Sequence, residues 1–504
     1  MTQPEGFNEN PYASADPHAD PSKIPRTSNP LSFLSKSAFL LAILGMLAAT
    51  TSVEAANDCV CNYDPTVDYF PNKIQPDYSS NFRIEYFKSY KKMTVIDSKV
   101  EYVTYAYLCG TPVPNLGNAN NTIEIPIKSA AVVSSTFVPY IEYIGERESL
   151  FFVSADHTQF KSCLRNLYDQ GRVVNGTFNK AGILLTNSTA YKFTGAPLDV
   201  VFMDSYNYKN ALRTTVTNTL GPRTKSIYIA EQLEFHPLGK LEWVEFVAAL
   251  YNKEYLVMNL AADLNAKYDC VKDLVVASPP AVKKKVLWGY CYYSTYSSTT
   301  DCYVGACPNY YCDLVKDAGG VMVSNTTSRL NTTQMYDLAA QADVWIFTSD
   351  NFGQQGASPQ FYTGDVKTLY DTLPVVINKQ VYDYLGQNPI DWFDDAKAQP
   401  GVVLMDLTQV LYGDRYVSTT ARKPDFLRNV FTEPAASSAP RLGADCNDTA
   451  APLYTLWDAG FCAMPSAVEL TTKPDIKLCT SDAATTMVHT MCLIIGVMFA
   501  GMWL

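Results

Sequence analysis

The chain has 504 residues, which is long enough for two domains of ordinary size rather than one core. Its formal net charge is −11, and its 39 Lys and Arg residues are spread along the sequence without a cluster. A nucleic-acid binder needs a concentrated basic surface to neutralise phosphates, so this composition argues against nucleic acid as a partner.

The N-terminal part has the layout of a signal peptide with a long polar leader. An apolar run from Ala38 to Ala49 follows a polar stretch that contains basic residues, and small residues precede position 56. The run is shorter than the roughly 20 residues that a bilayer core requires, so we expect cleavage after Ala55 and a signal peptide over 1–55. An uncleaved signal anchor is the alternative, because flanking residues could extend the span.

Short β-branched or aromatic runs alternate with amphipathic stretches over 85–235, which predicts an α/β lobe after a Cys-containing segment at 56–84. KKMTVI, EYVTYAYLCG, IEIPI and LDVVFMD are expected strands. The segment after IEIPI passes from an apolar run through Ser134 into a helix with Pro139 in its first turn.

A helical stretch begins after Pro237, with apolar residues at a 3.6-residue period and no Gly or Pro after the first turn. We expect one interlobe helix over 236–270. With about 30 helical residues and a rise of 1.5 Å per residue, it would span roughly 45 Å, which is enough to connect two lobes. A second α/β lobe over 271–431 is predicted from the strands KKKVLWGYCYY, GGVMV, DVWIFTSD and VVLMDL and the helix MYDLAAQA. The Ala-, Ser- and Pro-rich composition after Thr432 suits a stalk over 432–483.

The last residues, from Met487 to Leu504, are apolar and carry no basic tail. A single-pass helix normally has Lys or Arg on its cytoplasmic side, whereas small residues such as Ser481 and Ala483 suit a GPI attachment site. We expect a GPI signal over 484–504, with a C-terminal membrane helix as the alternative. Either anchor predicts a protein of the secretory pathway, held at the outer face of the plasma membrane or at another secretory-pathway membrane.

Removal of this tail with Cys492 leaves an even number of the 13 cysteines, which predicts disulfide pairing in an oxidising compartment. The spacings around Cys59 and Cys302 lack zinc knuckles, so we predict no metal site. His157 and His236 are expected to be surface or cap residues. Sequons typical of a eukaryotic secretory protein mark candidate glycosylation sites on the surface at Asn120, Asn175, Asn187, Asn325, Asn331 and Asn447.

Several stretches resemble the substrate-binding proteins of ABC importers, in the class with a single rigid interlobe helix that binds siderophores, haem or cobalamin. They are YKKMTVI, YLCGTPVPN, IEIPIKSAAVVSSTFVPYIEYIGERESLFFV, PLDVVFMD, AEQLEFHPLGKLEWVEFVAALYNKE and NPIDWFDDAKAQPGVVLMDLTQVLYGD, in this order between Phe87 and Phe431. The resemblance implies a class III periplasmic-binding-protein-like fold: two α/β lobes joined by one long helix, with a ligand cleft between the lobes.

That fold places the ligand where loops at the strand ends of both lobes meet. Hydroxyls at a helix N-terminus suit an anionic oxygen, and a Trp- and Tyr-rich strand end offers planar surface to a chelate or a tetrapyrrole. The residues expected in the cleft are Ser134, Ser135, Thr136, Glu231, Gln232, Trp288, Tyr290, Tyr292, Tyr293, Ser349, Asp350 and Asn351. Ordinary capping and strand packing are the alternative roles for these side chains.

We therefore expect a non-enzymatic surface protein that captures an iron–siderophore complex, haem or cobalamin as ligand, without an intrinsic cofactor. A membrane transporter or an uptake receptor would be its partner. A structural or adhesion glycoprotein with the same fold is one alternative. A secreted enzyme is the other, although the chain has no G-x-S-x-G or H-E-x-x-H motif, and its adjacent Asp394 and Asp395 are expected in solvent.

Overall fold

A computed structural model describes most of the chain between positions 59 and 433. The described residues are 59–116, 121–154, 162–178, 184–185, 198–209, 223–294, 299–305, 307–324, 329–349, 352, 361–386, 392–416, 423–433, 446 and 448–449. They belong to one compact unit, Asn57–Leu504. The apolar segments expected to be the signal peptide and the anchor lie outside the described residues, as does most of the expected stalk.

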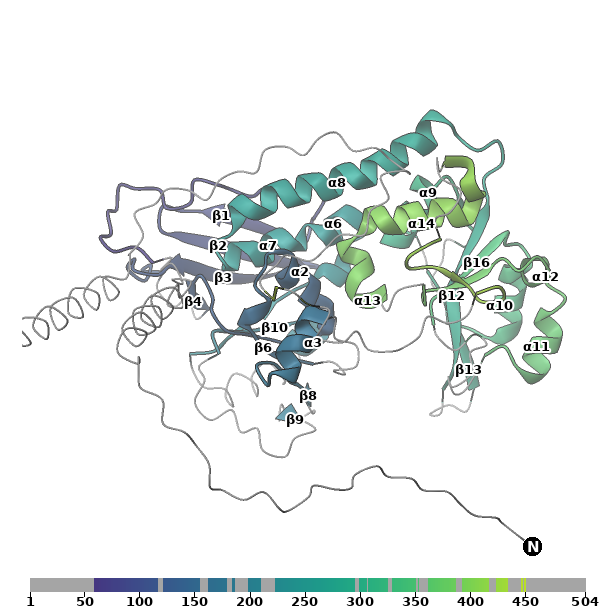
Figure 1. Cartoon of the computed structure of the whole chain (residues 1–504), viewed down its shortest axis with the longest axis horizontal. Helices are drawn as coiled ribbons and strands as arrows, with labels where there is room; N and C mark the ends of the chain where they lie inside the picture. The colour runs from purple at the N-terminus through teal and green to yellow at the C-terminus, as the bar shows by residue number, and fades with distance from the viewer. Residues whose placement is uncertain are drawn as a thin grey trace, which may run out of the picture. The chain divides into compact units, whose positions relative to one another are not determined.

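The first four strands form a mixed sheet in the order β1-β2-β3-β4 (Figure 1). They are β1 (Phe82–Tyr86), β2 (Tyr90–Asp97), β3 (Val100–Leu108) and β4 (Thr122–Ile125). Neighbours are antiparallel except β3 and β4, which are parallel. Side chains alternate between the faces of a strand, and the core-facing side of β2 carries Met93 and Val95. The three strands predicted here are confirmed.

A second sheet is entirely parallel, in the order β11-β10-β5-β6-β7. Its strands are β5 (Ala130–Val132), β6 (Leu150–Val153), β7 (Val174–Asn175), β10 (Val200–Met203) and β11 (Lys225–Tyr228). Every residue of β5 and β10 is buried, as expected for a parallel sheet covered on both faces. The connecting helices are α2 (Val138–Tyr143), α3 (Ser162–Asp169) and α4 (Ser205–Lys209), and a short pair, β8 (Thr177–Phe178) and β9 (Leu184–Leu185), lies apart. We call the described residues of 59–250 lobe 1.

The single long helix predicted over 236–270 is wrong, because three helices occupy this part of the chain. They are α6 (Pro237–Leu241), α7 (Trp243–Leu250) and α8 (Glu254–Ala277). The break before α8 lies at Asn252, which adopts a left-handed conformation with φ 56° that Asn tolerates better than most residues. The buried ammonium of Lys91 fixes the break by donating to the carbonyl of Ala249 at 2.7 Å and to Oδ1 of Asn252 at 3.3 Å.

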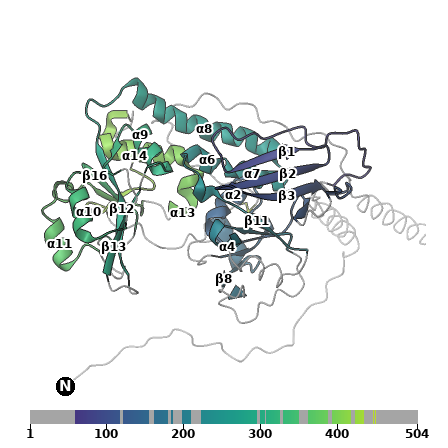
Figure 2. The same cartoon turned by 180° about the vertical axis from the view of Figure 1, so that it is seen from behind.

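The helix that joins the lobes is α8, and it starts beside the first sheet (Figure 1, Figure 2). Its first residue, Glu254, forms a buried ion pair with Lys91 of β2. Further along, the Tyr268 hydroxyl donates to Asp317 of α9 (Tyr310–Asp317) at 2.8 Å. At 1.5 Å per residue α8 is about 36 Å long, enough to pass from one lobe to the other.

Lobe 2, the described residues of 285–433, is built on a sheet in the order β15-β13-β12-β16-β17-β18, with β14 also paired to β12. The strands are β12 (Lys285–Ser294), β13 (Thr299–Val304), β14 (Val321–Met322), β15 (Arg329–Leu330), β16 (Val344–Phe347), β17 (Val381–Asp383) and β18 (Arg428–Asn429). Besides α9, its helices are α10 (Thr332–Ala339), α11 (Gly364–Tyr370), α12 (Pro374–Ile377), α13 (Trp392–Asp395) and α14 (Pro400–Tyr412). The chain thus has the expected fold of two α/β lobes joined by one long helix.

The strand predicted at VVLMDL is wrong, because these residues lie within α14. Pro400 occupies the first turn of this helix, where its fixed φ and missing N–H are tolerated. The helix is buried around most of its circumference, so its sequence lacks a polar stripe. A short apolar run of this kind cannot be assigned to strand or helix by periodicity alone.

All ten described cysteines are disulfide-bonded. Four of the bridges are Cys59–Cys109, Cys163–Cys446, Cys291–Cys302 and Cys307–Cys312. The prediction of disulfide pairing is confirmed for these residues, and their sulfurs are not free to bind zinc. The Cys163–Cys446 bridge ties the chain beyond lobe 2 back to lobe 1, where the Arg147 guanidinium also donates to the carbonyl of Thr449 at 2.7 Å.

Of the predicted glycosylation sites, Asn175 and Asn331 are described. Asn331 is exposed at the N-cap of α10, as expected for a surface sequon. Asn175 is only 6% exposed in β7, which contradicts its prediction as a surface position. The other four sequons lie outside the described residues. Within the described ranges, no helix has the length and apolar character needed to cross a membrane.

We predict that Lys91→Met lowers the free energy of unfolding by about 3–5 kcal/mol, because it leaves the Glu254 carboxylate buried without its partner. The double variant Lys91→Met/Glu254→Gln should recover part of this loss. The matched control is Lys92→Met, whose ion pair with Glu85 is partly exposed and is expected to contribute less than about 1 kcal/mol. Chemical denaturation of the secreted protein measures all three, and equal losses for Lys91→Met and Lys92→Met would contradict the prediction.

Candidate functional site

A cavity of about 410 Å³ lies between the two lobes. Lobe 1 contributes residues of three short helices: η1 (Ser135–Phe137), η4 (Glu231–Leu233) and α6. Lobe 2 contributes residues of α9, α13 and η5 (Ala396–Ala398). The lining residues are Thr136, Glu231, Gln232, Glu234, Phe235, Lys240, Asn309, Tyr310, Tyr311, Trp392, Phe393, Ala396 and Lys397.

Local structure fixes both walls of the cavity. On lobe 1, η1 follows β5 and η4 follows β11, so these residues come from loops at the carboxyl ends of parallel strands, where α/β proteins bind ligands. On lobe 2, the side chain of Asn309 caps α9 by accepting from the backbone N–H of Tyr311 at 2.8 Å. The Cys307–Cys312 disulfide closes the same turn, so the start of α9 is held from two sides.

An ion pair crosses from one lobe to the other at this cavity. Lys397 of η5 donates to Oε1 of Glu231 at 2.5 Å, and both side chains are less than a tenth exposed. The Thr136 hydroxyl also hydrogen-bonds Glu231. A second ammonium, that of Lys240, donates to the backbone carbonyl of Glu231 at 2.8 Å. Two lysines therefore lie beside one carboxylate.

Burial and charge shift the pKa values of these groups in predictable directions. Burial by itself raises the pKa of the Glu231 carboxyl, but the charges of Lys397 and Lys240 and the hydrogen bonds from Lys397 and Thr136 outweigh it and lower the pKa below its usual value. Burial lowers the pKa of Lys240 to about 8, against the opposing effect of Glu231. At neutral pH the carboxylate is ionised and Lys240 is mostly protonated.

Aromatic rings form the lobe 2 wall. Tyr310 and Tyr311 lie with ring centroids 3.9 Å apart, and the ammonium of Lys240 lies 4.6 Å from the Tyr310 ring centroid. Burial raises the pKa of both phenols, so these residues offer ring faces and O–H groups rather than phenolate ligands for a metal. Phe235 of lobe 1 and Phe393 of lobe 2 also line the cavity and are 58% and 53% exposed. The cavity thus presents apolar rings from both lobes to solvent.

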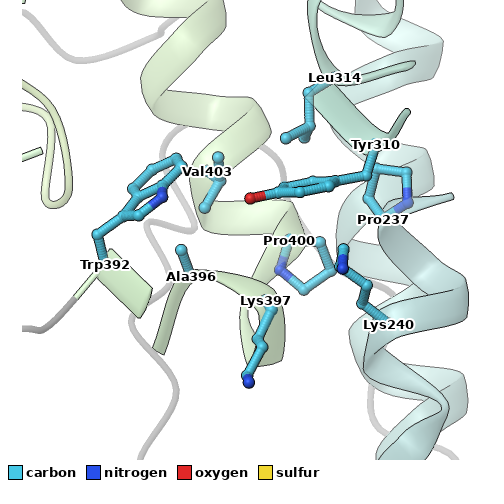
Figure 3. A pocket seen from close by; sticks show the side chains of 9 residues that line it. All are labelled: Pro237, Lys240, Tyr310, Leu314, Trp392, Ala396, Lys397, Pro400 and Val403. Carbon is cyan, nitrogen blue, oxygen red and sulfur yellow. The ribbon is translucent and has the colours of Figure 1, made fainter. Parts of the chain in front are cut away.

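A small apolar pocket of about 10 Å³ adjoins the cavity and shares Lys240, Tyr310, Trp392, Ala396 and Lys397 with it. It is large enough for about one water molecule. Figure 3 shows its lining, with the Tyr310 ring in the middle and the side chains of Lys240 and Lys397 on one side of that ring. The pocket therefore belongs to the same site.

Two more hydrogen bonds join the lobes next to the cavity. The Ser135 hydroxyl donates to Oδ1 of Asp394 at 2.9 Å, and the Tyr143 hydroxyl donates to the carbonyl of Ala398 at 2.9 Å. Asp395 is fully buried. The expectation that Asp394 and Asp395 lie in solvent is therefore wrong, because their helix α13 packs against lobe 1.

Several of the residues predicted for the cleft lie there. Thr136, Glu231 and Gln232 line the cavity. Ser135 lies beside it through its bond to Asp394, and the Ser134 hydroxyl is 2.9 Å from that of Thr136. Ser134 makes no side-chain cap bond to η1, so ordinary capping is not its role.

The aromatic strand β12 does not line the cavity, contrary to the expected placement. Trp288 is 1% exposed and lies behind the lining, with its ring centroid 4.7 Å from that of Tyr311. Tyr290 and Tyr292 stack with Tyr303 across the β12–β13 hairpin, and Tyr293 is exposed. Strand packing, the alternative role considered above, accounts for Trp288.

The remaining sequence predictions have mixed outcomes. Ser349 is half-buried after β16 and is not among the lining residues, and Asp350 and Asn351 lie outside the described residues, as does His157. His236 is a cap residue as predicted, since its Nδ1 accepts from the backbone N–H of Leu238 at 3.1 Å. The lysines and aromatic residues of the cavity were missed. Trp392, Phe393 and Lys397 lie within one short segment of the sequence, but the sequence does not reveal that this segment faces lobe 1.

No family model matches the chain. An uncharacterized lipoprotein of Methanocaldococcus jannaschii is 24% identical over 326 residues, which cover 60% of this chain and 71% of the lipoprotein. Among solved structures, Helicobacter pylori CeuE with Ni(II) bound aligns with a TM-score of 0.42 and 12% identity over 64% of this chain and 90% of CeuE. The periplasmic haem-binding protein HutB of Vibrio cholerae aligns with a TM-score of 0.39 and 13% identity over 56% of this chain and 98% of HutB.

We predict that Lys240 makes stability depend on pH. A lysine whose pKa is lowered on folding binds fewer protons in the folded than in the unfolded protein, so its contribution to stability rises as the pH rises from about 8 to about 10.5. Over that range the unfolding free energy of the wild type should gain about 3 kcal/mol relative to Lys240→Met. Denaturation curves at stepped pH measure this difference. Lys367→Met, at an exposed lysine, is the control: its unfolding free energy should change with pH as that of the wild type does. The same pH dependence for Lys240→Met as for the wild type would contradict the prediction.

Proposed function

We propose that this protein is a non-enzymatic binding protein that captures a small metal chelate, such as an iron–siderophore complex, haem or cobalamin, in the cavity between its lobes for uptake. The observation that carries the proposal is that both lobes line one cavity with aromatic rings around an ion-paired floor. Walls from two domains joined by a single helix can enclose a ligand that a surface patch cannot.

The size and chemistry of the cavity suit such a ligand. Its 410 Å³ falls within the range of about 300–1,000 Å³ that small-molecule sites occupy. Tyr310, Tyr311 and Trp392 provide planar surface with little rotamer entropy to lose, which suits the flat rings of a tetrapyrrole or an aromatic chelator. The exposed Phe235 and Phe393 extend that surface toward solvent.

The protonation state of Glu231 supports binding rather than catalysis. A general acid needs a raised pKa, whereas the ammonium groups beside Glu231 lower its pKa and hold the carboxylate ionised. Among the described residues, the lining contains neither histidine nor cysteine, so no nucleophile among them is activated by an imidazole. The groups present recognise charge and shape.

Disulfide bonding supports a location in the secretory pathway, at the outer face of the plasma membrane or at another secretory-pathway membrane. Disulfides persist in oxidising compartments, and every described cysteine is in one. We propose a GPI or single-pass anchor near the C-terminus, and delivery of the chelate to a membrane transporter or uptake receptor. The M. jannaschii relative is named a lipoprotein, which agrees with attachment to a membrane surface.

We predict saturable quenching of tryptophan fluorescence when the disulfide-bonded protein is titrated with ferrioxamine B, haem or cobalamin, because Trp392 lines the cavity. Phe393→Ala and Phe235→Ala should each weaken binding about tenfold, which corresponds to about 1.4 kcal/mol of lost ring contact. Phe87→Ala is the matched control, since Phe87 is also exposed but lies on lobe 1 outside the cavity lining. Folded protein that binds none of the three ligands would overturn the proposal and favour an adhesion or structural role.

A further inference from the structure

We propose that the ligand carries an anionic group, and that this group binds Lys240 and Lys397 by displacing Glu231 from Lys397, which breaks the ion pair between the lobes. This inference rests on the proposed function and specifies the chemical class of ligand. It defines an amphipathic anion: a body with planar rings and a carboxylate, catecholate or similar oxygen anion.

The ion pair is placed where a ligand must meet it. Lys397 and Glu231 are separated by 166 residues in the chain, come from different lobes, and both line the cavity. Their bond of 2.5 Å is therefore both a contact between the lobes and part of the ligand-binding surface. A ligand that fills the cavity cannot leave the electrostatics of this pair unchanged.

The two ammonium groups on the cavity floor differ in how they are paired. Lys397 bonds the Glu231 carboxylate directly, whereas Lys240 donates to the backbone carbonyl of Glu231 and interacts with the Glu231 and Glu234 carboxylates through space. Glu234, the other acidic residue of the lining, accepts from the Ser79 hydroxyl, the backbone N–H of Asn81 and the Trp243 indole. An incoming anion gives Lys240 a counter-charge at bonding distance.

Lys240 is well placed to share that anion. Its ammonium lies over the Tyr310 ring and is bonded to a neutral carbonyl, that of Glu231, rather than to a carboxylate. Burial without a full counter-charge lowers the pKa of Lys240 to about 8, because the charged form is costly where water is excluded. An anionic oxygen placed beside this ammonium removes part of that cost.

The other contacts between the lobes explain why loss of the ion pair need not separate them. The bonds of Ser135 to Asp394 and of Tyr143 to the carbonyl of Ala398 hold the same segment of lobe 2 without involving Lys397. The fully buried Tyr268 on α8 also stays bonded to Asp317. The ion pair is thus a removable contact within an interface that other bonds maintain.

The test compares two ligands that differ in charge and share a ring system: haem, with two propionates, and haem dimethyl ester, in which both are esterified. A second pair compares the charge of two iron complexes: a ferric tris-catecholate, which is anionic, and ferrioxamine B, which is not. For the wild-type protein we expect at least tenfold tighter binding of the anionic member of each pair that binds. Glu231→Gln should tighten binding of the anionic member about tenfold and leave the other within about twofold.

Lysine variants complete the design. Lys397→Met and Lys240→Met should each weaken binding of the anionic member at least tenfold and leave the other within about twofold. Exposed residues away from the cavity lining provide the controls Lys367→Met and Glu124→Gln, which should leave all affinities unchanged. Thermal unfolding of each variant verifies folding, and the unchanged affinity for the ester or for ferrioxamine B shows that the cavity itself is intact.

The outcomes separate the two proposals. Equal affinity for both members of every pair that binds, or an unchanged charge preference in Glu231→Gln and the lysine variants, would overturn the inference and leave chelate binding in place. Absence of binding by all four compounds to folded protein would overturn the inference, and absence of cobalamin binding as well would overturn the proposed function.

Discussion

The arrangement of the two lobes depends on the buried ion pair between Lys91 and Glu254. Lys91 is completely buried and also bonds the carbonyl of Ala249 and the side chain of Asn252, so a single ammonium ends α7, holds the left-handed turn and starts α8. A buried charge is costly unless it is paired, and here every donor direction of the lysine is used to set the course of the chain. The direction in which α8 leaves lobe 1 decides where lobe 2 can be.

The lobe 2 wall of the cavity depends in turn on how closely α14 approaches α8. A Cβ on Gly401 would lie 3.1 Å from the backbone nitrogen of Tyr268, so a larger residue at this position would push the helices apart. The segment just before α14 carries Trp392 and Lys397, and it reaches lobe 1 through the Tyr143 hydroxyl and Glu231. The helix contact and the ion pair therefore position the same lining residues from two sides.

The sequence predicts the elements well where local pattern decides them and poorly where tertiary structure does. The β-branched runs of β2 and β10 and the Pro-led α2 are confirmed because alternation, burial and first-turn proline act locally. Asn252 breaks the long helix through a bond to Lys91, more than 150 residues away in the chain, so no helical period could reveal it. The residues of α14 resemble a strand in sequence because a helix buried on nearly all sides has no polar stripe.

The site was harder to predict than the fold. The Tyr-rich part of β12 was expected in the cleft, but its rings stack along the hairpin with β13, and Tyr310 and Tyr311 of the next helix line the cavity instead. Lys240 and Lys397 escaped notice because a lysine becomes a candidate ligand only when burial and a shared carboxylate are known.

The burial of Lys397 explains why the site contains an ion pair between the lobes. Lys397 is about nine-tenths buried, and an ammonium in that position needs a counter-charge whether or not a ligand is bound. Glu231 provides it in this structure, and under our proposal an anionic oxygen of the ligand provides it in the complex. An exchange of one partner for another costs far less than breaking a buried pair outright, because no charge is left uncompensated at either end: Glu231 keeps Lys240 and the Thr136 hydroxyl beside it. A ligand without an anion would have to leave the pair intact and fit around it, so the same contact that joins the lobes also selects by charge.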